Sequence, residues 1–184
     1  MVIAYHAIFT TYSTWLPNDP RGSFSKAIYN AELAALGGIQ YGRQNPQPDA
    51  RTLRRFRTAT VPTLSRAPYF LNDTTRPLVG EALGRDVGRL GITAYSCAIM
   101  NDHVHLVVLR SKYRIEYIIN QVKGRATSAL GLSETPWTRG GWKVFLDDEE
   151  AIHAAVAYVE ANPPAAGLAP QQWGFVQPLP PRGV

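Results

Sequence analysis

Two histidines separated by one hydrophobic residue, His103 and His105, stand in a run that reads Met-Asn-Asp-His-Val-His-Leu-Val-Val. The β-branched residues of this run favour a strand, in which successive side chains point to opposite faces. The two histidines are therefore expected on one face, with Val104 and Leu106 on the other. Two imidazoles on one face are half of a metal site, although a solvent-facing strand can also carry two histidines without any ligand.

A second pattern, some fifty residues further on, predicts a helix. Four acidic residues at 147–150 suit a helix N-terminus, and hydrophobic residues recur at helical spacing over 152–159. The Pro-Pro pair that follows Asn162 is expected to end the helix. Tyr158 and Asn162 then lie one turn apart at the edge of the apolar stripe, where a side chain can still reach a cleft. The alternative is a tyrosine at the rim of the core without a function.

Together these motifs resemble the HUH single-strand DNA transposases that use one catalytic tyrosine. The nearer branch is the REP-associated tyrosine transposases, related to the insertion-sequence transposases (TnpA), whose helix commonly ends in Tyr-Ile-x-x-Asn-Pro-x-x-Ala-Gly-Leu. From residue 158 this chain reads Tyr-Val-Glu-Ala-Asn-Pro-Pro-Ala-Ala-Gly-Leu. The resemblance covers residues 1–16 and about 72–168, and it leaves the roughly sixty residues that follow the first strand without a counterpart.

The resemblance implies a role for each matching residue. His103 and His105 match the pair that binds a divalent metal, and Asn162 matches the polar residue that completes the site. Tyr158 matches the nucleophile. Imidazole nitrogens with oxygen donors suit Mg²⁺ or Mn²⁺, which the resemblance favours over a structural zinc with four protein ligands. The implied activity is a metal-dependent single-stranded DNA endonuclease and strand transferase that forms a covalent 5′-phosphotyrosine at hairpin-containing DNA ends.

Two other functions are compatible with parts of this pattern. One is a non-catalytic protein, derived from such a transposase, that binds hairpin or single-stranded DNA without cutting it. The other is a small metal-dependent hydrolase in which the histidine pair activates a water molecule. The hydrolase has no need of Tyr158, and the binding protein needs none of the four motif residues.

The charge of the chain favours a nucleic-acid partner. The formal net charge is +5 with a sequence pI of about 9.5. Residues 1–70 contain eight Lys or Arg against three Asp or Glu, so this part holds the entire excess. The densest cluster, which we expect to contact single-stranded or hairpin DNA, consists of Arg51, Arg54, Arg55 and Arg57. A solvated basic loop is the alternative.

The predicted elements indicate an α+β fold. Strands are expected at 3–12, 92–99, 103–110 and 143–146, and helices at 73–90 and 114–130, with a short helix possible at 27–36. This order fits a ferredoxin-like (RRM-like) antiparallel sheet with helices on one face, followed by the C-terminal helix that carries Tyr158. The same fold is implied by the resemblance.

Length and composition complete the expectations. We expect one transposase domain over residues 1–184, with an inserted basic segment at about 17–70. An extended tail is expected at about 169–184, either packed by Trp173 and Phe175 or disordered at its end. A single cysteine, Cys97, excludes an internal disulfide. With neither a signal peptide nor a long apolar run, the chain is expected in the cytoplasm, associated with the nucleoid and not with a membrane, as a monomer or a homodimer.

Overall fold

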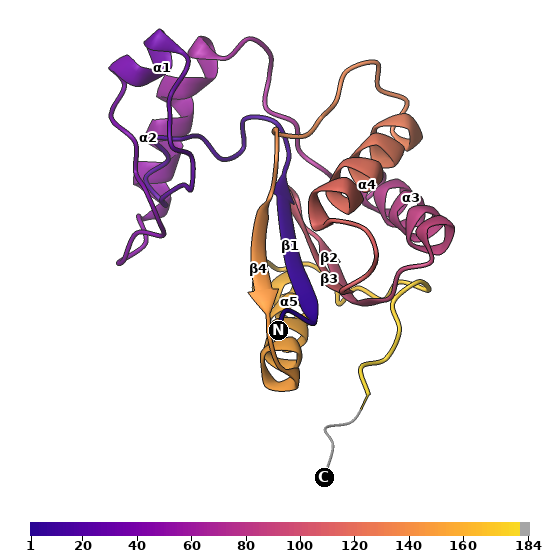
Figure 1. Cartoon of the computed structure of the whole chain (residues 1–184). Coiled ribbons are helices and arrows are strands. Elements are labelled where there is room, and N and C mark those ends of the chain that lie inside the picture. Colours follow the sequence, from indigo (N-terminus) through magenta and orange to yellow (C-terminus); the bar gives the residue numbers. More distant parts are fainter. Residues whose placement is uncertain (181–184) are drawn as a thin grey trace. The chain divides into compact units, whose positions relative to one another are not determined.

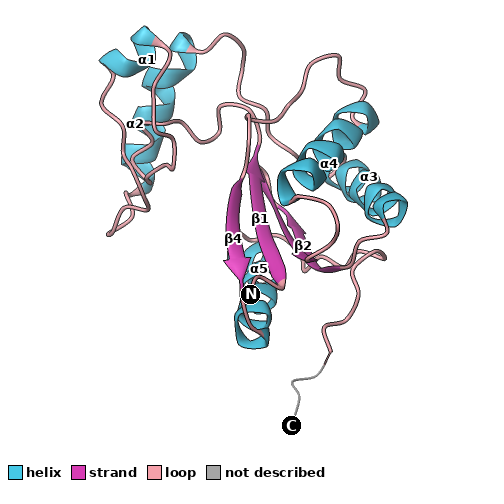
Figure 2. Ribbon diagram, viewed as in Figure 1, coloured by secondary structure: helices cyan, strands magenta, loops and turns pink. Residues whose placement is uncertain are grey.

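The computed structural model describes residues 1–180 and contains an antiparallel four-stranded sheet with helices on both faces (Figures 1 and 2). In chain order the elements are β1 (Ala4–Thr10), α1 (Ala31–Ala35), α2 (Ala50–Thr60), η1 (Val61–Thr63), α3 (Thr75–Leu90), β2 (Ala94–Ile99), β3 (His103–Leu109), α4 (Ile115–Ala129), β4 (Trp142–Leu146) and α5 (Glu149–Ala165). The strand order is β2-β3-β1-β4. The predicted α+β fold is therefore confirmed.

The chain divides into two compact units. The first consists of residues 1–10 together with the chain from residue 70 onward, and it contains the sheet. The second is Thr11–Tyr69, which carries α1 and α2. All eight basic residues of the first seventy lie in this second unit.

Side chains along the central strands alternate between the two faces of the sheet, and each face contributes to its own hydrophobic layer. The layer under α5 contains Val107 of β3 and Ala98 of β2, packed with Val156 and Val159 of the helix. The opposite layer contains Leu106 and its alternate neighbours and is covered by α3 and α4 (Figure 2). His103, His105 and Val107 are alternate residues of β3 and therefore lie on the same face of the sheet, so both histidines point toward α5.

Helix α5 does not end at its proline pair, as the sequence predicted, but continues to Ala165. A proline lacks only its own N–H, and the next amides still reach carbonyls of the preceding turn: Ala166 N donates to Asn162 O at 3.0 Å. Beyond Ala165, the turn is closed by Gly167, whose φ is +74°, and Leu168 N donates to Pro163 O.

The second unit contains a helix that the sequence pattern did not predict. In α2, Asp49 is the N-cap, and its carboxylate accepts from Thr52 N at 2.6 Å. The two larger apolar residues, Leu53 and Phe56, stand on one side of a helix that is otherwise mostly arginine and threonine. The two faces of this helix are clearly separated, but its low overall hydrophobicity and its run of arginines favoured a solvated basic segment, which explains the missed helix.

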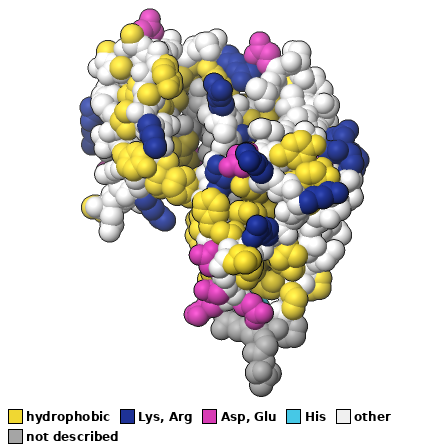
Figure 3. Space-filling view, in the orientation of Figure 1, with side chains coloured by type: hydrophobic (Ala, Val, Ile, Leu, Met, Phe, Trp, Pro, Cys, Tyr) yellow, Lys and Arg dark blue, Asp and Glu magenta, His cyan; other side chains and the backbone are white. Residues whose placement is uncertain are grey.

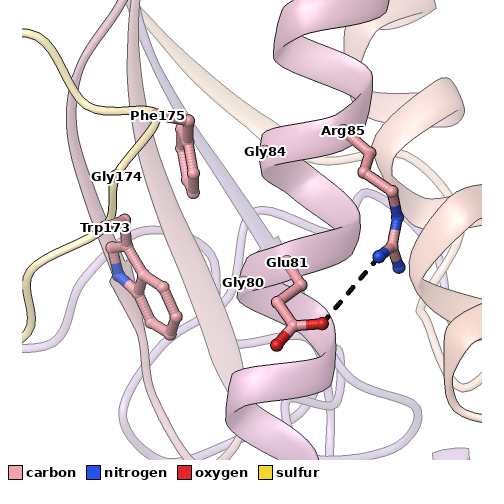
Figure 4. A pocket seen from close by; sticks show the side chains of 7 residues that line it. All are labelled: Gly80, Glu81, Gly84, Arg85, Trp173, Gly174 and Phe175. Carbon is pink, nitrogen blue, oxygen red and sulfur yellow. Dashed lines mark ion pairs between the residues drawn. The ribbon is translucent and has the colours of Figure 1, made fainter.

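The C-terminal tail is extended and packs against α3 and β2. Trp173 lies against Gly80 and Phe175 against Gly84 of α3 (Figure 4). Both backbone groups of Ile99, on the outer strand β2, bond to the Gln171 amide at 2.8 Å. The tail thus covers part of an otherwise open sheet edge. Its last residues, 181–184, lie outside the described residues.

We predict that Gly80→Ala destabilises the protein by about 1–3 kcal/mol, because a Cβ at this position would lie 2.0 Å from the Trp173 ring. Gly88→Ala is the matched control on the same helix, since a Cβ there meets nothing within 4 Å. It should be neutral or slightly stabilising. Urea unfolding monitored by circular dichroism measures both, and equal losses of stability would contradict the packing role of Gly80.

Candidate functional site

The two histidines of the motif meet at the beginning of β3, on the face that α5 covers. Their Nε2 atoms are 2.9 Å apart. His105 is buried, with 3% of its surface exposed, whereas the His103 side chain is 18% exposed. His105 therefore anchors the pair in the core, and His103 is the member that solvent can reach.

Each histidine uses its other ring nitrogen for a second contact. Asp102 Oδ1 accepts from His103 Nδ1 at 2.6 Å. His105 Nδ1 lies 2.9 Å from Nε2 of His6, a residue of β1. Four side chains thus form a continuous chain of contacts that runs from Asp102 to His6.

Burial keeps the inner histidines neutral. It lowers the pKa of His6 to about 4. Burial, with smaller effects of neighbouring His103 and His6, lowers the pKa of His105 to about 2. A neutral imidazole has one nitrogen with a free lone pair, which is the form that binds a metal.

Tyr158 of α5 stands against this histidine cluster. Its ring centroid is 5.7 Å from that of His105 and 6.0 Å from that of His6, with both contacts edge-on. The residue is 51% exposed, and its hydroxyl makes no hydrogen bond among the described residues. The sheet and α5 therefore bring the predicted nucleophile to the predicted metal-binding pair, with its reactive group accessible.

Asn162 lies one turn after Tyr158 and is half-buried. Its Nδ2 donates to the Tyr158 carbonyl at 2.7 Å, which fixes the amide and leaves Oδ1 without a hydrogen bond within residues 1–180. No hydrogen bond joins Asn162 to either motif histidine in the described part of the chain.

The side chains that could act as metal donors at this site are the two motif histidines and the amide of Asn162. Among the described residues, no group of three or more His, Cys, Asp or Glu side chains could hold a metal. In the structure the two Nε2 atoms, 2.9 Å apart, are in hydrogen-bond contact with each other.

His6 is the site residue that the sequence pattern missed. His6 falls within the first predicted strand, but whether it lies on the same face of the sheet as the motif histidines depends on how β1 pairs with β3. In the structure Ile8 pairs with His105 and His6 with Val107, so His6 is the diagonal neighbour of His105 on the same face. That register joins residues 99 positions apart and leaves no local signal.

The four predicted DNA-binding arginines lie in the second unit, on α2. All four are exposed, as are many Lys and Arg side chains of this unit (Figure 3). Their helical positions place Arg51, Arg54 and Arg55 on the side of α2 opposite its two larger apolar residues. Arg57 lies between the apolar side and this basic side. The helix therefore presents a basic face to solvent.

No family model and no curated protein matches the chain. Among solved structures, it is similar to a REP-associated tyrosine transposase bound to a REP hairpin, with a TM-score of 0.52 over 94% of this chain and 74% of that one. The fold of this chain is that of a REP-associated tyrosine transposase. Sequence identity is 11%. A candidate transposase from Deinococcus radiodurans R1 also matches, with a TM-score of 0.38, 12% identity, and coverage of 88% and 91%.

Proposed function

We propose that this chain is a metal-dependent single-stranded DNA endonuclease and strand transferase of the REP-associated tyrosine transposase type. One observation carries the proposal: an exposed tyrosine stands beside a histidine pair whose Nε2 atoms converge to 2.9 Å. A fold shared at 11% identity is compatible with many activities, so the proposal rests on these side chains.

The metal site that we propose is formed by His103, His105 and Asn162. The two histidines contribute Nε2 atoms, and the amide of Asn162 retains an oxygen that is free to bind. A bound Mg²⁺ or Mn²⁺ would neutralise charge on the scissile phosphate and on the departing oxygen. Three protein ligands leave positions for the phosphate and for water.

Tyr158 supplies the nucleophile in this proposal. Its phenolic oxygen forms a bond to phosphorus, and the bond from phosphorus to the 3′ oxygen breaks. The phenolic proton passes to solvent, and the departing 3′ oxygen takes up a proton to become a 3′-OH. The ester on Tyr158 preserves the phosphodiester energy, so a 3′-OH can attack it and rejoin a strand without ATP.

Hairpin-containing DNA ends are the proposed substrate. The solved structure with the same fold is described with a REP hairpin bound. The basic face of α2 adds a second proposed contact with the phosphates of single-stranded or hairpin DNA. Such a protein would act in the cytoplasm, associated with the nucleoid, as a monomer or homodimer. No helix among residues 1–180 is long and apolar enough to cross a membrane.

A denaturing gel tests the reaction. Oligonucleotides with a hairpin and a single-stranded flank, labelled at either the 5′ or the 3′ end, are incubated with the protein and Mg²⁺ or Mn²⁺. The 3′-labelled fragment should become covalently attached to protein, and the 5′-labelled fragment should be released with an extendable 3′-OH. Cleavage of both oligonucleotides without an adduct would indicate the hydrolase, and binding without cleavage would indicate the non-catalytic protein.

The arginines of α2 give a prediction for binding. Replacing Arg51, Arg54, Arg55 and Arg57 by Gln should weaken binding of all sequences similarly. The slope of log affinity against log salt should fall by roughly 0.7 for each single-strand phosphate that the variant no longer binds, or about 3 if all four arginines bind one. The adduct should still form at saturating DNA, because Tyr158 and its histidines are untouched.

The matched control is Arg85→Gln, on the exposed side of α3 in the first unit, where the side chain is 60% exposed and 3.8 Å from Glu81. It should change neither affinity nor salt slope. Fluorescence anisotropy over a salt series measures both quantities. An unchanged slope in the quadruple variant would show that the basic helix is solvated and that DNA is held elsewhere.

A further inference from the structure

His6 has no assigned part in the reaction, yet it is built into the proposed site. It is buried, with 5% of its surface exposed, and its Nε2 lies 2.9 Å from Nδ1 of His105. The two rings are 5.1 Å apart and tilted by 33°. His6 does not reach the Nε2 atoms that would bind a metal, so its position differs from that of a ligand.

The chemistry of imidazole gives this contact a consequence. When Nε2 of a neutral histidine binds a metal, its proton is on Nδ1, which then needs an acceptor. For His103 the acceptor is the Asp102 carboxylate at 2.6 Å. For His105, Nε2 of His6 is in the corresponding position. Both histidines of the motif therefore have a second partner on the side away from the pair.

We propose that His6 is the positioning residue of His105, accepting the Nδ1 proton and so holding the ring with its Nε2 lone pair directed at the metal. This inference rests on the metal site proposed above. Burial of both rings makes the contact specific, because little solvent can reach Nδ1 to replace His6.

Histidine suits this position because it can either accept or donate at Nε2. Without a metal, the 2.9 Å contact between the Nε2 atoms of His103 and His105 requires a proton on one of them. If that proton is on His105, its Nδ1 becomes an acceptor and His6 donates to it. With a metal at its Nε2, His105 would carry its proton on Nδ1 and His6 would carry its own proton on Nδ1, so the direction of the His6–His105 bond would be reversed. His6 can therefore hydrogen-bond to Nδ1 of His105 both with and without a bound metal.

Substitution of His6 tests the proposal through metal binding. His6→Phe keeps an aromatic ring in the sheet but has no hydrogen-bonding nitrogen, and it should weaken Mn²⁺ affinity by about 10- to 100-fold. His6→Gln, which can accept or donate through its amide, should retain affinity within a few-fold of wild type. Electron paramagnetic resonance of free Mn²⁺ during titration measures the affinity without reference to DNA cleavage.

The matched control is Ile8→Val, two residues along β1 on the same face and paired with His105 in the sheet. It changes packing beside His105 without altering a hydrogen bond, and it should leave Mn²⁺ affinity unchanged. ¹⁵N spectra of the histidine rings with Mg²⁺ give a second readout. His105 should be protonated at Nδ1 in wild type and should lose this fixed tautomer in His6→Phe.

The outcomes separate the two proposals. If the wild type binds no Mn²⁺, the metal site is wrong and the role of His6 is wrong with it. If the wild type binds Mn²⁺ and His6→Phe binds it equally well, with the same His105 tautomer, only the role of His6 is overturned. If His6→Phe does not fold, His6→Leu and His6→Gln provide the same comparison, with thermal unfolding as the check on the native state.

Discussion

Replacing Tyr158 by Phe is expected to reduce the covalent protein–DNA adduct below detection while leaving DNA affinity within a few-fold of wild type. The ring contacts with His6 and His105 are edge-on contacts that Phe retains. The hydroxyl has no partner among the described residues, so its removal leaves no buried polar group unsatisfied. A denaturing gel with labelled hairpin oligonucleotides and Mg²⁺ or Mn²⁺ measures the adduct.

Tyr117→Phe is the control for this experiment, because Tyr117 of α4 is also exposed, at 42%, and is not in contact with the histidine cluster. It should form the adduct at the wild-type rate. An adduct that persists in Tyr158→Phe would contradict the proposed nucleophile, and Tyr95, Tyr113 and Tyr117 would be the next candidates.

The sheet and its three large helices were predictable because their signals are local. Alternation around His103 and helical spacing around Tyr158 each depend on fewer than about twenty neighbouring residues. The end of α5 was predicted wrongly, because a proline pair in the last turn removes two N–H groups without preventing the helix from continuing to Ala165.

The composition of the site was predictable only in part. The motif residues His103, His105 and Tyr158 lie together in the structure, as the resemblance implied. The position of His6 depends on the register between β1 and β3, and a shift of one residue would have placed it on the opposite face. Nothing in the sequence near His6 specifies that register. A local sequence pattern therefore misses site residues such as His6, whose position is set by pairing between strands that are distant in the sequence.

Removing a motif histidine should abolish cleavage. His103→Ala and His105→Ala each delete one of three proposed protein ligands, so Mg²⁺ or Mn²⁺ should bind far more weakly and excess metal should rescue the reaction poorly. The two variants should differ in stability. His105 is buried and bonded at both nitrogens, and its loss leaves His6 without its partner, at a cost of about 1–3 kcal/mol. His103 is partly exposed, and its loss should cost less.

His103→Ala is therefore the cleaner variant for the metal, since loss of cleavage with an unchanged unfolding transition assigns the defect to the site. Ile8→Val, which alters packing beside His105 and retains both ligands, should cleave normally. The adduct assay, Mn²⁺ titration and thermal unfolding are measured on the same preparations. Full wild-type cleavage in EDTA would exclude a metal-assisted reaction, and Tyr158 would then act on a phosphate whose charge is neutralised by protein side chains alone.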